Sequence, residues 1–210
     1  MDIYHKSLDI LKKIVENQEK FNYKVYLVGG WSVWMYNPYM KSKDIDILVK
    51  KEDFWKLRNL LLNEGFRETS RVLEKHGFAM LWGDDKIEID VYDDKIGKFS
   101  IDEFVTNAIV KKMNRWDVRV VSVDDLFLMK VYTAGERLGT AKGEKDLSDL
   151  LALLDTHYKQ IDFKRIAKTI KIAEIVRILF ADYRSASKIY PISYEKYHQI
   201  AAYMKSLGIL

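Results

Sequence analysis

The sequence contains no cysteine among its 210 residues. It therefore cannot form a disulfide, a zinc ribbon or an iron–sulfur cluster, and it has no thiol to act as a nucleophile. Its histidines are also unsuited to metal binding, because His5, His76, His157 and His198 are scattered without the spacing of metal ligands. A metal ion bound to this chain is therefore expected to have carboxylate oxygens as ligands.

Proline and long apolar runs are also scarce. The chain has two prolines, Pro38 and Pro191, and ten glycines, which predicts short loops and no flexible linker between domains. No apolar run reaches the roughly 18 residues that a membrane-spanning helix requires. The first residues also lack the charged and then apolar layout of a signal peptide. We therefore expect a protein of the cytoplasm with no membrane partner.

Charge of one sign is not in large excess. The 35 Lys and Arg residues against 31 Asp and Glu residues give a net charge of +4, which is too small to indicate nucleic-acid binding by itself. Hydrophobic residues make up 48% of the chain and charged residues 31%, as in ordinary globular proteins. This composition predicts a folded chain rather than a disordered or fibrous one.

The apolar pattern of the first half predicts strands mixed with helices. Glycines and polar clusters separate the expected elements. The expected helices cover residues 4–15, 31–36, 52–63 and 102–108, with Gly65 as the C-terminal cap of the third. The expected strands cover residues 24–28, 44–49, 66–73, 76–82, 86–92 and 117–123, with a hairpin turn at 83–85 and the last strand at the sheet edge.

From residue 124 onward the pattern is helical almost to the end. The expected helices cover residues 124–138, 144–155, 162–187 with a break, and 193–207. We therefore expect two domains. Residues 1–123 form a small mixed sheet flanked by helices, and residues 124–210 form a helical region. The predicted fold class is α+β.

Two acidic residues mark the strand expected over 44–49. Residues two apart on a strand point to the same face, so Asp44 and Asp46 project together while Ile45 and Ile47 enter the core. Two neighbouring carboxylates repel each other unless solvent or a divalent cation neutralises them. Their hard oxygen atoms favour Mg²⁺ or Mn²⁺ as that cation.

A later strand repeats this pattern with Glu88 and Asp90. If the two strands are neighbours, a third carboxylate reaches the same metal ion. Three carboxylates with one or two Mg²⁺ ions are what nucleotidyl or phosphoryl transfer requires. Gly29 and Gly30 stand between a strand and a helix, where backbone N–H groups and the helix dipole can meet a phosphate. Ser32 would add a hydroxyl group.

The order of strand, Gly-Gly turn, helix, Asp-x-Asp strand and later Glu-x-Asp strand resembles the DNA polymerase β-like nucleotidyltransferase superfamily. The resemblance covers about residues 24–92. It implies a glycine turn that binds the triphosphate and three catalytic acids that bind metal. The matching positions are Gly29, Gly30, Asp44, Asp46 and Asp90, with Glu88 as the rival of Asp90 for the third acid.

The second half is similar to a subgroup that includes abortive-infection toxins and aminoglycoside nucleotidyltransferase-like proteins. In that subgroup a helical Lys, a downstream Arg and a Lys-Asp-x-x-Asp segment face the strand carboxylates across a cleft. The resemblance implies that Lys130 or Lys145 neutralises triphosphate charge, and that Asp146 and Asp149 orient these lysines. The alternative is a set of exposed surface ion pairs with little energetic effect.

The resemblance implies a Mg²⁺-dependent nucleotidyltransferase that moves a nucleoside monophosphate from an NTP to a hydroxyl acceptor and releases pyrophosphate. The acceptor stays open between RNA or tRNA, protein and a small molecule, and a toxin–antitoxin role is one possible setting. The alternative is an inactive nucleotide-binding module of the same fold. The presence of all three acids argues against it, because a binding module has no need to gather like charges.

Overall fold

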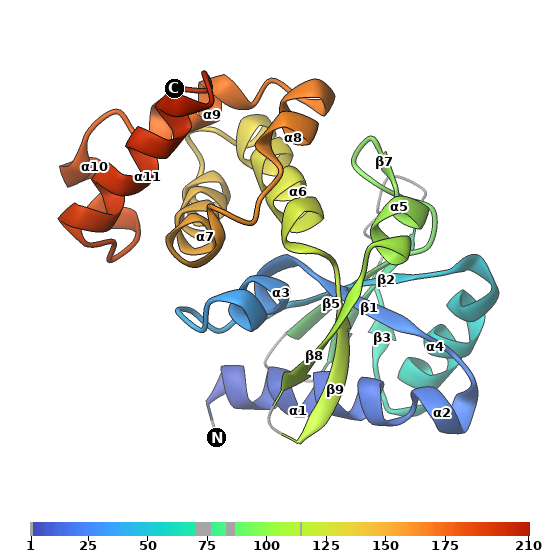
Figure 1. The fold of residues 1–210 in the computed structure, drawn as a ribbon. Coiled ribbons are helices and arrows are strands. Elements are labelled where there is room, and N and C mark those ends of the chain that lie inside the picture. The colour runs from blue at the N-terminus through green and yellow to red at the C-terminus, as the bar shows by residue number, and fades with distance from the viewer. Residues whose placement is uncertain (1, 70–76, 83–86, 114) are drawn as a thin grey trace. The chain divides into compact units, whose positions relative to one another are not determined.

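The computed structural model describes residues 2–210 except 70–76, 83–86 and 114, and except the side chains of 78, 79, 81 and 82. The chain divides into two compact units, Met1–Ser122 and Val123–Leu210 (Figure 1). The first unit combines a mixed sheet with helices, and the second is helical. The α+β fold class is therefore confirmed.

The first unit is built on a seven-stranded sheet with the order β3-β4-β5-β2-β1-β9-β8. Its strands are β1 Val25–Val28, β2 Ile45–Val49, β3 Arg67–Glu68, β4 Gly77–Trp82, β5 Ile87–Tyr92, β8 Ile109–Met113 and β9 Trp116–Val120. The pairs β2 with β5 and β1 with β9 are parallel, and the others are antiparallel. A separate small hairpin consists of β6 Lys95–Ile96 and β7 Phe99–Ser100.

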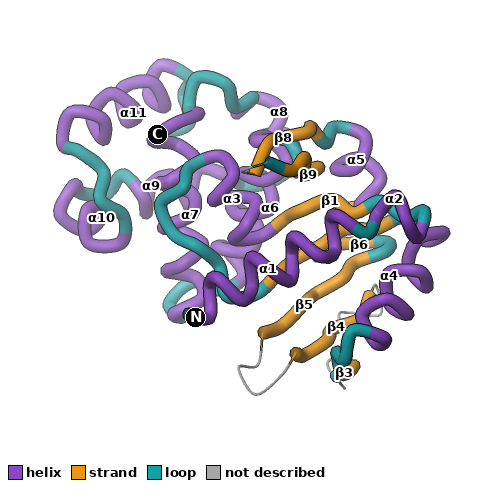
Figure 2. Tube along the Cα trace, turned by 90° about the horizontal axis from the view of Figure 1, so that it is seen from below, coloured by secondary structure: helices purple, strands orange, loops and turns teal. Residues whose placement is uncertain are grey.

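The centre of this sheet forms the core of the first unit. Ile45, Ile47, Ile89 and Val91 are 0% exposed, and every residue of β1 is buried. Helices cover the sheet, and α1 and α4 both lie on the side that faces the viewer in Figure 2. The helices of this unit are α1 Ile3–Glu16, α2 Gln18–Phe21, α3 Gly29–Tyr36, α4 Lys51–Asn63 and α5 Ile101–Thr106.

The second unit contains six helices among its described residues: α6 Val123–Glu136, α7 Ala141–His157, α8 Phe163–Thr169, α9 Ile172–Leu179, α10 Tyr183–Ile189 and α11 Tyr194–Ser206. Its core includes Leu150, Leu153 and Leu154 of α7, which are 0% exposed. In the part of the chain that the structure describes, no helix has both the length and the apolar character needed to cross a membrane.

Several sequence-based element predictions are confirmed. Gly65 has φ +87° and ends α4 in a Schellman motif, because Phe66 N–H donates to the carbonyl of Leu61 and Gly65 N–H to that of Leu62. Strands β4 and β5 pair antiparallel from Gly77 opposite Tyr92 onward, as a hairpin requires. The turn predicted at 83–85, and residues 70–73 of another predicted strand, lie outside the described residues.

Other element predictions are wrong in instructive ways. The strand predicted at the sheet edge over 117–123 is β9, which lies between β1 and β8, and the true edge strand β8 was not predicted. The hairpin of β6 and β7 was also missed. The helix predicted over 162–187 with one break is three helices, α8 to α10. Asp162 and Asp182 begin two of them, because their carboxylates accept hydrogen bonds from the backbone N–H groups of Arg165 and Ser185.

Candidate active site

The glycine turn between β1 and α3 is closed by an acidic side chain. Gly29 begins α3 with φ +65°, a conformation that residues with a Cβ atom rarely adopt. A Cβ atom at Gly29 would lie 2.0 Å from Oδ2 of Asp46 and 2.8 Å from its Cβ. The side chain of Asp46 therefore packs directly against the first residue of α3. Glycine is required here both by the backbone conformation and by the space that Asp46 occupies.

Strand register brings Asp46 and Asp90 together. The antiparallel pairing of β1 with β2 sets Val28 opposite Asp46, and the parallel pairing of β2 with β5 sets Asp46 opposite Asp90. Residues in register on neighbouring strands point to the same face of a sheet. Asp46 is half-buried, and Asp90 is only 8% exposed. Two carboxylates thus lie side by side next to the beginning of α3.

Two further acids extend this row. Asp44 is exposed and directly precedes β2 instead of belonging to it, which corrects the predicted strand boundary. Its Oδ1 atom accepts a hydrogen bond from the backbone N–H of Glu88 at 3.4 Å. Glu88 is half-buried and stands two residues before Asp90, so both lie on the same face of β5. The four acids form two neighbouring pairs along β2 and β5.

The acids partly fit the predicted metal site. The four acids supply carboxylate oxygens, and such donors suit Mg²⁺ or Mn²⁺. Within the described ranges, no three Asp, Glu, His or Cys side chains are arranged to hold one metal ion. Asp46 and Asp90 are aligned to share a cation, whereas Asp44 would have to turn from the N–H of Glu88 to join them. The three-carboxylate site therefore stays a prediction, and register favours Asp90 over Glu88 as the third acid.

Helix α3 holds the other predicted residues of the glycine turn. Gly30 is the second residue of the helix and is buried. Ser32 is 0% exposed, and its Oγ atom has no hydrogen-bond partner among the residues that the structure describes. A contact of Ser32 with phosphate stays a prediction. Trp31 and Tyr36 have structural roles, because Trp31 Nε1 donates to Oγ of Ser7 and the Tyr36 hydroxyl donates to the carbonyl of Val121.

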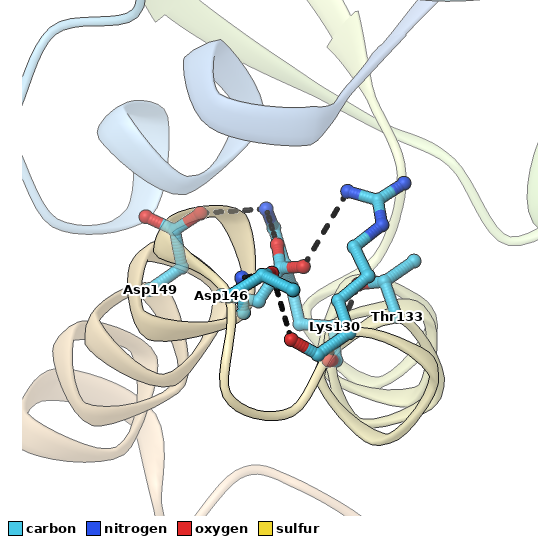
Figure 3. A network of polar contacts seen from close by, with 7 residues as sticks. Lys130, Thr133, Asp146 and Asp149 are labelled. Atoms are coloured by element: carbon cyan, nitrogen blue, oxygen red, sulfur yellow. Dashed lines mark hydrogen bonds and ion pairs between the residues drawn. The ribbon is translucent and has the colours of Figure 1, made fainter.

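The second unit contains a buried ion-pair network around Lys130 of α6 (Figure 3). Lys130 is 9% exposed, and its Nζ atom lies 2.9 Å from Oδ1 of Asp146 and 2.6 Å from Oδ2 of Asp149. Arg137 also approaches Asp146, with Nη1 3.6 Å from Oδ2. Burial alone would lower the pKa of Lys130, but the two carboxylates outweigh it and raise the pKa. Lys130 is therefore held in its charged form.

The predicted contact of Asp146 and Asp149 with Lys130 is thus present. It forms because residues three apart on α7 share one helix face, which here packs against α6. Lys130 and Arg137 carry two positive charges, and Asp146 and Asp149 carry two negative charges. The network is therefore neutral and has no excess positive charge. Lys145 is exposed on the same helix. The binding of triphosphate by either lysine stays a prediction.

We expect Gly29→Ala to lower the free energy of unfolding more than Gly65→Ala does. Both positions have a positive φ, so alanine costs about 1 kcal/mol at each through backbone strain. At Gly65 a Cβ atom meets nothing within 4 Å, whereas at Gly29 it overlaps Asp46. Urea unfolding of the two variants measures the difference. Equal losses of stability would show that Asp46 does not pack against the turn.

We expect Lys130→Met to destabilise the protein by about 3 to 5 kcal/mol, because it removes the cation that both buried carboxylates contact and leaves Asp146 with only the partly exposed Arg137. The matched control is Arg137→Met, which removes a cation whose side chain is 47% exposed and should cost less than about 1 kcal/mol. Adding Asp146→Asn and Asp149→Asn to Lys130→Met should recover much of the loss. Denaturant unfolding of the four proteins checks this, and an equal cost for both single variants would contradict it.

Solved structures with a similar fold include an adenylyltransferase and a nucleotidyltransferase-like protein. A crystal structure of ANT(2″)-Ia in complex with adenylyl-2″-tobramycin has a TM-score of 0.60 at 16% identity, over 77% of this chain and 93% of that chain. An antigenic nucleotidyltransferase-like protein from Paracoccidioides brasiliensis gives 0.55 at 14%, over 87% and 93%. The lincosamide antibiotic adenylyltransferase LnuA with lincomycin bound gives 0.52 at 14%, over 68% and 95%. These identities are too low to show more than a shared fold, and that fold confirms the predicted DNA polymerase β-like architecture.

A family model described as "Uncharacterised nucleotidyltransferase" matches residues 39–191, well over half of the chain. The match includes Asp44, Asp46 and Asp90, and also the Lys130 network of the second unit. The match begins after the glycine turn, so it does not include Gly29 and Gly30. The inclusion of this turn in the candidate site rests on the fold and on the contact of Gly29 with Asp46. No curated protein sequence matches the chain. The chain belongs to this family of nucleotidyltransferases.

Proposed function

We propose that this protein transfers a nucleoside monophosphate from an NTP to a hydroxyl acceptor in a reaction that depends on Mg²⁺ or Mn²⁺. One observation carries the proposal: Asp46 is in register with Asp90 and also packs against Gly29. A pair of carboxylates and a helix N-terminus without a side chain are thereby adjacent. The first suits a divalent cation and the second suits a phosphate group, and an NTP bound to Mg²⁺ supplies both.

The proposed reaction exchanges a phosphoanhydride bond of the NTP for a phosphoester bond to the acceptor. The acceptor oxygen bonds to the α-phosphorus, the bond from that phosphorus to the bridging oxygen of the β-phosphate breaks, and pyrophosphate leaves with the electron pair. The hydroxyl proton passes to water. A bound divalent cation would lower the pKa of the acceptor hydroxyl and neutralise charge on the leaving pyrophosphate. Asp46 and Asp90 would hold that cation, with Asp44 as the third ligand.

The remaining predicted residues would bind the triphosphate. The backbone N–H groups at Gly29 and Gly30 would donate hydrogen bonds to phosphate oxygens, because the first N–H groups of a helix have no partner within the helix. Ser32, Lys130 and Lys145 are proposed as additional phosphate ligands. In this proposal the first unit is the catalytic domain, the helical unit completes the site, and the enzyme acts in the cytoplasm.

The acceptor class has to be found by experiment, and the similar structures indicate which acceptors to test first. ANT(2″)-Ia is solved with adenylyl-2″-tobramycin and the lincosamide adenylyltransferase with lincomycin, so this fold accommodates small-molecule acceptors. Small molecules with several hydroxyl groups therefore come first in a screen, before RNA and protein. Incubation with each α-³²P-labelled NTP, Mg²⁺ and the separate acceptor pools identifies the pool that becomes labelled.

We expect Asp46→Asn to reduce labelling by several orders of magnitude, because it removes a charged ligand of the cation that acts on the α-phosphate. The matched control is Asp9→Asn, which neutralises an exposed acid of α1 and should leave labelling unchanged. Retention of more than about a tenth of wild-type labelling by Asp46→Asn would contradict the assignment. Saturable NTP binding with no labelled acceptor in any pool would instead favour the inactive binding module.

A further inference from the structure

Strand β8 leaves one side of its backbone open for pairing. The described sheet ends at β8, which pairs with β9 from Ile109 opposite Val120 to Met113 opposite Trp116. An edge strand directs half of its backbone N–H and C=O groups away from its neighbour, where another extended chain can pair with them. The opposite edge of the sheet is β3, which has only two residues. β8 is therefore the longer of the two edges.

The first half of β8 is apolar and exposed. Ile109 is 44% exposed and Val110 is 61% exposed. Consecutive residues of a strand lie on opposite faces, so both faces of the sheet present an exposed apolar side chain at this edge. Charged residues and proline are the usual protection of edge strands against pairing. Neither is present at Ile109 or Val110.

The rest of the hairpin is basic. Residues 109–120 contain Lys111, Lys112, Arg115 and Arg119 against Asp117, a net charge of +3. Residues 1–108 contain 17 basic and 19 acidic residues, so the remainder of the first unit is slightly negative. The positive charge is thus concentrated at this edge. Its sign selects an acidic partner, because like charges on directly opposed residues destabilise strand pairing.

The two lysines of β8 lie on different faces. Lys112 is exposed on the face of Val110, and Lys111 is half-buried with its Nζ atom 3.7 Å from the ring centroid of Tyr36. Burial lowers the pKa of Lys111, so a carboxylate on a neighbouring strand would stabilise its charged form. An acid on either face of an added strand would therefore meet a cation.

A second copy of this chain fits the edge poorly. Full-length antiparallel pairing of β8 with itself would set Lys111 opposite Lys111 and Val110 opposite Lys112. The first pair opposes like charges, and the second opposes an apolar side chain with a charged one. Nucleic acid would use the basic residues but not the exposed Ile109 and Val110. An acidic and apolar strand uses all of these features.

We propose that β8 is a docking edge for an extended acidic segment of a partner protein, which adds to the sheet as an eighth strand. The order of residues in β8 defines the partner sequence. A strand antiparallel to β8 would have two acidic residues opposite Lys112 and Lys111, followed by two apolar residues opposite Val110 and Ile109. Backbone hydrogen bonds would supply affinity, and these four side chains would supply specificity.

The test is an NMR titration of the full chain with a capped peptide of sequence Thr-Glu-Glu-Val-Val-Thr. We expect chemical-shift changes and slower amide exchange in β8. A peptide with lysine in place of glutamate should not bind. Lys112→Glu should weaken binding of the glutamate peptide about tenfold and allow the lysine peptide to bind. Lys205→Glu, at an exposed position of α11, is the matched control and should have no effect.

Three results would overturn the proposal. The first is absence of changes in β8 with millimolar glutamate peptide, or equal binding of the lysine peptide. The second is a dependence of the β8 signals on protein concentration alone, which would make the edge an interface between copies. The third is displacement of the glutamate peptide by a short single-stranded RNA, which would make the edge a nucleic-acid contact.

Discussion

The parallel pairing of β2 with β5 is the interaction on which the candidate site depends. It sets Asp46 beside Asp90, and two adjacent carboxylates repel each other in a partly buried place. The core must offset that repulsion. Ile45 and Ile47 on β2 and Ile89 on β5 alternate with these acids and are 0% exposed, so the same strands that present the charges are anchored by apolar burial. A bound cation would remove the repulsion that the apolar residues otherwise have to overcome.

The glycine turn extends this arrangement from the sheet to a helix. Asp46 occupies the space in which a side chain of Gly29 would lie, so the carboxylate row and the beginning of α3 are fixed relative to each other. A nucleotide site needs this proximity, because the cation and the helix N-terminus act on the same phosphate groups. The Lys130 network is a different kind of structure. Its charges are balanced within the helical unit, and its removal is expected to act first on stability.

The sequence was most informative where a periodic pattern met a buried face. The Ile45 to Val49 pattern and the helical second half were readable because burial enforces the period of each element. The cap at Gly65 was readable for another reason, because glycine is the usual residue where a helix ends with a positive φ. The edge strand β8 was missed because Ile109 and Val110 are both exposed, so its residues do not alternate between core and solvent. The contact of Gly29 with Asp46 joins residues that are close only after β1 and β2 have paired. The position of β9 inside the sheet likewise follows from its pairing with β1, which no local pattern encodes.

Thermal unfolding with and without Mg²⁺ tests the central claim, that the fold holds Asp46 and Asp90 together as a cation site. In chelator, Asp46→Asn and Asp90→Asn should each melt at or above the wild-type temperature, because each removes one of two repelling charges. Mg²⁺ with NTP should raise the Tm of the wild type by mass action and should raise that of the variants far less. A variant that melts below the wild type in chelator and still gains the full shift with Mg²⁺ and NTP would contradict the account.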